Sequence, residues 1–193
     1  MKIIIDTNSL LSLVRYYLPF DKENILYNLI QEKIETSEMI IIDAVFTQCN
    51  YISKGIILEK LEFLKDKSFL KKSKTPFKTE TLIIPNPKKF FHLLNNNFVN
   101  HTVKRQKKIT DAEFENEKEN YLKDADMRLI ISSLNYIAEN EDVILVTEET
   151  ATSNDNKLFK KLPSICADLN IKSISLPQLI EILSSEIKLN ISK

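Results

Sequence analysis

The chain has 193 residues, of which 43% are apolar and 28% charged, and its 27 basic and 27 acidic side chains give a formal net charge of zero. These values are ordinary for a globular protein and argue neither for nor against nucleic-acid binding. The single glycine, Gly55, excludes glycine-rich phosphate loops, because those loops need several glycines for close backbone approach. No run reaches the ~20 apolar residues of a membrane helix. We therefore expect one cytoplasmic domain, 1–193, with no membrane segment.

The hydrophobic pattern predicts strands and helices that alternate along the chain. In chain order it predicts a strand at 2–5, helices at 7–18 and 21–34, a strand at 39–42, helices at 44–53 and 57–64, a helix at 126–139, a strand at 143–146, a polar loop at 147–156, a helix at 162–169, a strand at 172–175 and a helix at 177–187. This alternation indicates an α/β fold with a parallel sheet. Between them lies 69–121, which we expect to be a lysine-rich, mainly helical insertion or cap. In it the pattern predicts helices at 90–98 and 111–122, with a polar, lysine-rich loop between these two helices.

Acidic residues follow two of the predicted strands and begin one helix. Asp6 comes directly after the first strand, Glu148 and Glu149 follow the third, and Asp124 and Asp126 stand where the preceding helix begins. Sites in open parallel sheets lie beyond the carboxyl ends of the strands, so these three segments should meet at one edge. Each acid also has an ordinary role, as a helix cap or a solvated loop residue. Clustered carboxylates repel one another unless they share protons or bind cations, and hard ions such as Mg²⁺ or Mn²⁺ prefer oxygen ligands.

The same segments resemble the motifs of PIN-domain nucleases. The stretch from Met1 to Leu10, with a hydrophobic strand followed by Asp6-Thr7-Asn8, is similar to the opening of that family. The stretch 124–130 resembles its later helix motif, and 143–149 resembles its last strand, which ends in Thr, any residue and an acid. The likeness covers about 1–53 and 123–183 and extends to VapC-like bacterial toxins of an uncharacterised subfamily.

The resemblance implies a PIN-like three-layer α/β/α fold with about four parallel strands and a helical insertion. It also implies roles for individual residues. Asp6, Asp126 and Glu149 would bind Mg²⁺ or Mn²⁺, which would make the chain a metal-dependent endoribonuclease. The residues expected to support these carboxylates or the substrate are Thr7, Asn8, Asp124, Thr147 and Glu148.

One position departs from the family pattern. The family carries a Glu on the helix after the second strand, and Gln48 is the equivalent residue here. Because Gln is uncharged, it binds a hard cation far more weakly than Glu. Three explanations are open: an introduced substitution, which we favour, a natural member with little or no activity, or replacement of the acid by Asp43 or Glu59.

The function that the resemblance implies is hydrolysis of RNA, such as tRNA, by the toxin of a type II toxin–antitoxin pair. The resemblance implies a cognate antitoxin and a homodimer. The densest basic stretch, 101–108, supplies candidate RNA contacts at Lys104, Arg105, Lys107 and Lys108, although a solvated loop is an equal alternative. One competing function is an inactive PIN module that binds RNA or protein. Another is a phosphatase-like hydrolase, against which Asn8 counts, because that class has a second Asp at this position.

Overall fold

A four-stranded parallel sheet forms the centre of the protein. The computed structural model describes residues 1–151 and 156–191, so residues 152–155 of the predicted polar loop lie outside the described part. The strands are β1 (Lys2–Ile5), β2 (Met39–Ile40), β3 (Val143–Val146) and β4 (Lys172–Ile174), in the order β2-β1-β3-β4. The predicted strands are therefore confirmed, with β2 and β4 shorter at their carboxyl ends.

Helices make up most of the remaining described structure. In chain order they are α1 (Thr7–Ser12), α2 (Ile25–Glu35), α3 (Asp43–Cys49), α4 (Ile56–Lys60), α5 (Lys67–Ser73), α6 (Pro87–Asn96), α7 (His101–Gln106), α8 (Asp111–Lys123), α9 (Ala125–Ala138), α10 (Leu162–Leu169) and α11 (Leu176–Ile191). A π-helical turn, Leu13–Tyr17, continues α1, and short 3-10 turns follow at Leu18–Phe20, Ile52–Gly55 and Glu62–Lys65.

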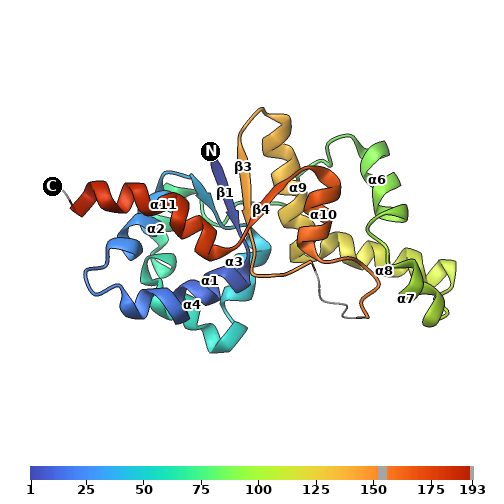
Figure 1. Ribbon diagram of the computed structural model, residues 1–193, viewed down its shortest axis with the longest axis horizontal. Coiled ribbons are helices and arrows are strands. Elements are labelled where there is room, and N and C mark those ends of the chain that lie inside the picture. Colours follow the sequence, from blue (N-terminus) through green and yellow to red (C-terminus); the bar gives the residue numbers. More distant parts are fainter. Residues whose placement is uncertain (152–155, 192–193) are drawn as a thin grey trace.

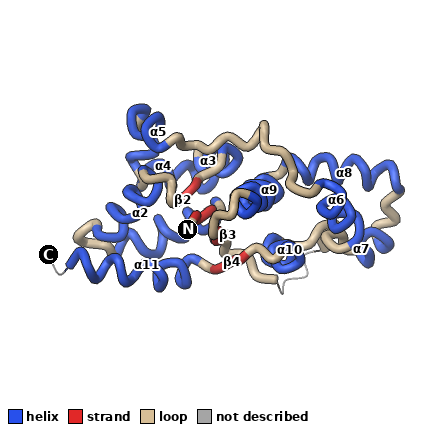
Figure 2. Tube along the Cα trace, turned by 90° about the horizontal axis from the view of Figure 1, so that it is seen from above, coloured by secondary structure: helices blue, strands red, loops and turns tan. Residues whose placement is uncertain are grey.

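The helices cover both faces of the sheet. Figure 2 shows α2 and α11 on one side of the strands and α9 and α10 on the other. This is the three-layer α/β/α arrangement that the sequence predicted. Helices α6, α7 and α8 extend beyond α9 and α10 as a lobe, at the right of Figure 1. They belong to the segment expected to be a cap, whereas α5 packs against α2, on the opposite side of the molecule.

The core explains why these segments fold as they do. Ile3, Ile4 and Ile5 of β1 and all four residues of β3 are buried, as expected for a central parallel strand covered on both faces. On α9, Met127 and Ile130 are fully buried at helical spacing. Burying one such side chain contributes roughly 1.5–3 kcal/mol, so the sheet and α9 account for much of the hydrophobic stabilisation.

Two local predictions were wrong. The stretch 101–106 is a helix rather than a polar loop, because the Asn100 side chain caps it by accepting a hydrogen bond from the N–H of Val103 (3.2 Å) and Val103 is buried. The helix predicted at 44–53 ends at Cys49. A right-handed helix cannot continue to residue 53, because Ser53, Lys54 and Gly55 all have positive φ.

The order of the strands fixes where a site can lie. The chain passes from β1 to β2 by way of α2 on one face, and returns to β3, on the other side of β1, by way of α9 on the opposite face. Such a reversal of direction opens a crevice at the carboxyl ends of the two central strands, here β1 and β3.

Candidate active site

Asp6 and Thr147 meet at the carboxyl ends of the two central strands. The strands β1 and β3 are paired along their length, and the N–H of Asp6 donates to the carbonyl of Val146 at 3.0 Å. Beyond that bond, the hydroxyl of Thr147 donates to Oδ2 of Asp6 at 2.7 Å. The sequence expectation that the first and third strands deliver their polar residues to one edge is therefore correct.

Asp6 is buried and held rigidly. Its carboxylate is in a residue only 6% exposed, and its Oδ1 accepts a hydrogen bond from the N–H of Ser9 at 2.6 Å, which caps α1. Burial raises the pKa of Asp6, an effect that the hydrogen bonds from Ser9 and Thr147 oppose and that the nearby charge of Glu149 increases. Asp6 can therefore cap α1 and bind a cation at the same time, because each of its carboxylate oxygens keeps a second lone pair.

Asp126 is the most perturbed acid of the site. It lies in the first turn of α9, and its pKa is raised to about 6 by burial, then by repulsion from Glu149 and Asp6. The charge of Lys157 only partly offsets the repulsion. Three segments distant in sequence therefore bring the carboxylates of Asp6, Asp126 and Glu149 close enough to repel one another. We call these three residues the acidic centre.

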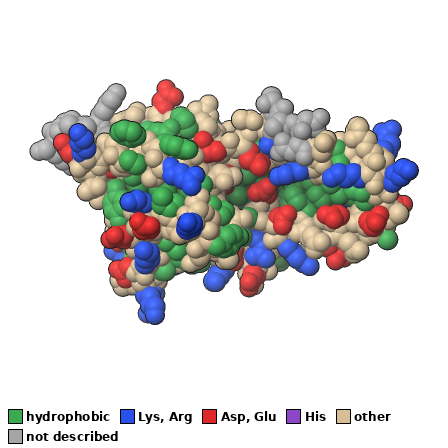
Figure 3. Space-filling view, turned by 90° about the horizontal axis from the view of Figure 1, so that it is seen from below, with side chains coloured by type: hydrophobic (Ala, Val, Ile, Leu, Met, Phe, Trp, Pro, Cys, Tyr) green, Lys and Arg blue, Asp and Glu red, His purple; other side chains and the backbone are tan. Residues whose placement is uncertain are grey.

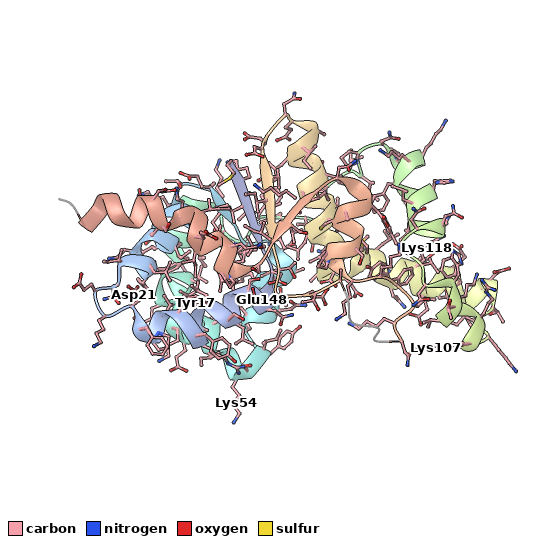
Figure 4. The ribbon with its side chains drawn as sticks, in the orientation of Figure 1. Tyr17, Asp21, Lys54, Lys107, Lys118 and Glu148 are labelled. Atoms are coloured by element: carbon pink, nitrogen blue, oxygen red, sulfur yellow. The ribbon has the colours of Figure 1, made fainter. Side chains whose placement is uncertain are left out.

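The two glutamates after β3 have separate partners. Oε2 of Glu149 accepts a hydrogen bond from the N–H of Leu162, the first residue of α10, at 3.1 Å. The N–H of Glu149 in turn donates to Oγ1 of Thr147 at 3.1 Å. Glu148 is exposed and accepts from the N–H of Leu176, the first residue of α11, at 2.8 Å; Figure 4 shows it near α1. Glu149 therefore belongs to the acidic centre, whereas the hydrogen bond of Glu148 connects the end of β3 to the start of α11.

The remaining predicted residues lie around this centre. The buried Thr7 hydroxyl donates to Oε1 of the half-buried Gln48, so α1 and α3 are joined next to Asp6. Asn8 is exposed on α1. Asp124 is exposed at the start of α9 without capping it through its side chain, and burial and the charge of Glu117 raise its pKa.

Asp43 is engaged elsewhere. Its Oδ2 accepts from the N–H of Thr79 at 2.9 Å, and its Oδ1 accepts from the Thr79 hydroxyl at 2.5 Å and lies 3.7 Å from Nη1 of Arg128. These donors and the guanidinium lower the pKa of Asp43 against the effect of burial. Asp43 is therefore a stabilised carboxylate without the repulsion seen at Asp126, and Glu59 is exposed on α4. The contact with Thr79 could not be predicted, because Thr79 lies in a segment whose sequence shows no helical or strand periodicity.

A pocket of about 530 Å³ opens from the acidic centre along the α6–α8 lobe. Figure 3, which shows the face at the carboxyl ends of the strands, has a strip of hydrophobic side chains there between a row of basic and a row of acidic ones. Of the predicted RNA contacts, Lys107 lines this pocket. Lys104 instead pairs with Asp111 at 3.0 Å and lies 4.2 Å from the centre of the Phe114 ring, while Arg105 and Lys108 are exposed.

The donor set of the acidic centre fits a hard divalent cation. Asp6, Asp126 and Glu149 offer only carboxylate oxygens, and the fully buried Ser9 hydroxyl beside Asp6 forms no hydrogen bond of normal geometry within the described residues. No three acidic, histidine or cysteine side chains in that part of the chain form a ready-made metal cage. Mg²⁺ does not require one, because it keeps several waters and is commonly bound through one or two carboxylates together with substrate phosphates.

The comparisons with known proteins place the chain in one family. The family model described as "Domain of unknown function (DUF4411)" matches residues 83–187, more than half of the chain. This protein is a member of the DUF4411 family. The match includes the α6–α8 lobe, Asp126 and Glu149, whereas Asp6 and Gln48 precede it. No curated protein and no solved structure matches the chain. Among the helices of 1–151 and 156–191, none has the length and hydrophobicity needed to cross a bilayer.

Proposed function

We propose that this DUF4411 protein is a divalent-metal-dependent endoribonuclease that hydrolyses RNA phosphodiesters. The observation that carries the proposal is the grouping of Asp6, Asp126 and Glu149 at the crevice between β1 and β3, where burial, together with the charges of Glu149 and Asp6, raises the pKa of Asp126 to about 6. Carboxylates that burial and mutual repulsion destabilise in their ionised form gain stability when a cation binds them. The PIN-like order of the motifs supports the same reading.

Asp6 and Asp126 would hold the metal ion, with Glu149 contributing directly or through a water. A bound Mg²⁺ or Mn²⁺ would supply an activated water and neutralise charge on the phosphodiester. The protein's own part is orientation. Thr147 fixes one oxygen of Asp6, Ser9 fixes the other, and the N–H of Leu162 holds Glu149. Such outer partners keep carboxylates in a single orientation and preserve metal affinity.

Gln48 is the position on which the level of activity depends. Its Oε1 accepts the Thr7 hydroxyl, an arrangement that a Glu carboxylate can adopt without any change in length. The substitution Gln48→Glu should therefore add a negative charge near Asp6 while preserving the contact between α1 and α3. We expect it to tighten Mn²⁺ binding and to increase RNA cleavage.

A second candidate function is a non-catalytic module that binds RNA or protein. It is favoured by the helix-capping bonds of Glu148 and Glu149, which give both acids a structural purpose, and by Gln48 in place of an acid. We also propose that the protein is the toxin of a toxin–antitoxin pair, binds a cognate antitoxin and forms a homodimer. These three statements rest on the PIN resemblance alone.

The deciding experiment is calorimetric titration of Mn²⁺ into the wild type, Asp6→Asn and Gln48→Glu, followed by cleavage of a mixed RNA pool. The proposal expects binding by the wild type, weaker or absent binding by Asp6→Asn and tighter binding by Gln48→Glu. Cleavage should follow the same order. If Gln48→Glu neither binds Mn²⁺ nor cleaves RNA, the catalytic proposal is wrong and the binding module is favoured.

A further inference from the structure

The pocket beside the acidic centre has the composition of a site for one nucleotide. It runs between the start of α9 and α8 on one side and the segment 156–161 on the other, and it reaches the turn after α7. Its volume, about 530 Å³, lies within the range of roughly 300–1,000 Å³ found for small-molecule sites. Asp126 and Glu149 form its inner end, so whatever occupies the pocket adjoins the carboxylates of the proposed metal centre.

The far wall of the pocket is rigid. Phe159 pairs with Val99 in an antiparallel bridge, which two backbone hydrogen bonds of 2.7 Å reinforce, one on each side of Phe159. The ring of Phe159 stacks on Tyr121 of α8, with the centroids 4.0 Å apart and the planes within 2°. The Tyr121 hydroxyl donates to the carbonyl of Lys160 at 3.3 Å. The segment is therefore fixed to both α8 and the turn before α7, and the pocket is formed before any ligand arrives.

The three kinds of lining group suit the three parts of a nucleotide. Half-buried Ile109, with the 9% of Leu158 and of Phe159 that remains exposed, provides an apolar surface for a base. The ammonium groups of Lys107 and Lys157, both exposed, can contact phosphate oxygens. The acids on the opposite side can accept hydrogen bonds from exocyclic amines and ribose hydroxyls. These acids are Glu117 and Asp124.

Simpler occupants match only part of this lining. An inorganic anion would meet four carboxylates as well as the lysines, and a purely apolar molecule would leave the charged rows without partners. Figure 3 shows that the apolar strip continues between the two charged rows, which favours an elongated ligand with an apolar face and polar edges.

We propose that this pocket binds the nucleotide next to the cleaved phosphodiester, with its base on the strip between Ile109 and Phe159 and its phosphate toward Lys107 and Lys157. The inference rests on the proposed ribonuclease function, because it places the bound nucleotide against Asp126 and Glu149. It adds to that function a subsite in the α6–α8 lobe. Lys107 and Lys157 are binding residues in this role and take no part in bond cleavage.

The test is equilibrium binding of uridine 5′-monophosphate, uridine 3′-monophosphate, uridine and inorganic phosphate to the full chain in Mn²⁺. We expect one of the two monophosphates to bind at least about tenfold more tightly than either uridine or phosphate, because it uses the strip and the lysines together. The preferred isomer would identify the side of the cut on which the pocket lies. If phosphate binds as well as both monophosphates, the pocket recognises no nucleotide and the proposal is wrong.

Matched charge reversals locate the binding. Lys107→Glu should weaken monophosphate binding about five- to tenfold, as expected for reversing one phosphate contact. Lys88→Glu makes the same change of net charge at an exposed position of α6, outside the pocket lining, and should leave binding within about twofold. Figure 4 shows Lys107 at the edge of the lobe, where its replacement should not disturb the core. Equal losses in both variants would mean general electrostatic attraction and would overturn the pocket assignment.

The Mn²⁺ titration keeps this proposal separate from the ribonuclease proposal. Binding of Mn²⁺ without selective monophosphate binding would refute the pocket and leave the metal centre standing. Monophosphate binding that Lys107→Glu weakens, without any Mn²⁺ binding, would support the pocket and overturn the metal-dependent function. Absence of both would overturn both.

Discussion

Replacing Asp126 with Asn should stabilise the metal-free protein at neutral pH. The folded environment raises the pKa of Asp126 from 3.8 to about 6, through burial and the charges of Glu149 and Asp6. A shift of about two units, at ~1.4 kcal/mol per unit, makes the ionised carboxylate cost up to about 3 kcal/mol of folding free energy at pH 7. Since Asp126 is partly exposed, solvent screening reduces this, and we expect a gain of about 1–2 kcal/mol for Asp126→Asn.

The pH dependence has a definite sign. Because the folded pKa of Asp126 lies above its unfolded one, the folded state binds this proton more strongly, and the contribution of Asp126 to stability decreases as the pH rises from about 4 to 7. The advantage of Asp126→Asn should therefore be present at pH 7 and small at pH 4. Urea unfolding in the presence of a chelator measures it at both values.

An exposed aspartate before β3 provides the control. Asp142→Asn removes the same charge away from the cluster and should change the unfolding free energy by less than about 0.5 kcal/mol at either pH. Added Mn²⁺ should stabilise the wild type and not Asp126→Asn. If Asp126→Asn is no more stable than the wild type at pH 7, the inferred repulsion among the three carboxylates is wrong.

Three further substitutions test the local structure. Thr147→Val removes the donor to buried Asp6 and should cost about 1–3 kcal/mol in urea unfolding and reduce Mn²⁺ affinity about tenfold or more; unchanged affinity would show that this hydrogen bond does not orient the ligand. Gly55→Ala should cost about 1–2 kcal/mol in thermal unfolding, since the residue has φ +78° and an added Cβ would lie 3.1 Å from a backbone oxygen; no loss would mean that the turn readjusts freely. Asp43→Asn should cost about 1–2 kcal/mol at pH 7, because the lowered pKa of Asp43 means that its ionised form is the stabilised one. That cost should shrink as acid protonates Asp43 in the wild type, the opposite trend to Asp126, and a constant cost would exclude a charge-dependent contact with Arg128.

The strands and the long helices were predictable because each has a strong local signal. The run Ile3–Ile5 and the run Val143–Val146 are too short and too apolar for an exposed helix, and both form buried central strands. The helix at α9 follows from the spacing of Met127 and Ile130. Helix α7 was not predicted, because the polar composition of 101–106 is typical of a loop. Its formation depends on the burial of Val103 and on the cap from Asn100, which the hydrophobic pattern does not reveal.

The position of the candidate site could be predicted, but the hydrogen-bond partners of its residues could not. A strand that ends in Asp6-Thr7 and another that ends in Thr147 can be placed at one edge by topology alone. The different partners of Glu148 and Glu149 could not be predicted, because they depend on where α10 and α11 begin in space. The bond from Thr7 to Gln48 likewise depends on how α1 packs against α3.

By itself, the sequence determined the order of the strands and of most helices along the chain, the parallel α/β class and the identity of the acids at the strand ends, because these follow from hydrophobic period and chain connectivity. The three-layer arrangement was implied by the PIN resemblance and is confirmed by the structure. Only the tertiary structure decided that Asp126 is repelled by Glu149 and Asp6, while the carboxylate of Asp43 is stabilised by hydrogen bonds from Thr79 and by the charge of Arg128. It also decided that the α6–α8 lobe forms one wall of a pocket with the segment 156–161. Both depend on distances between groups far apart along the chain, which a local pattern does not contain.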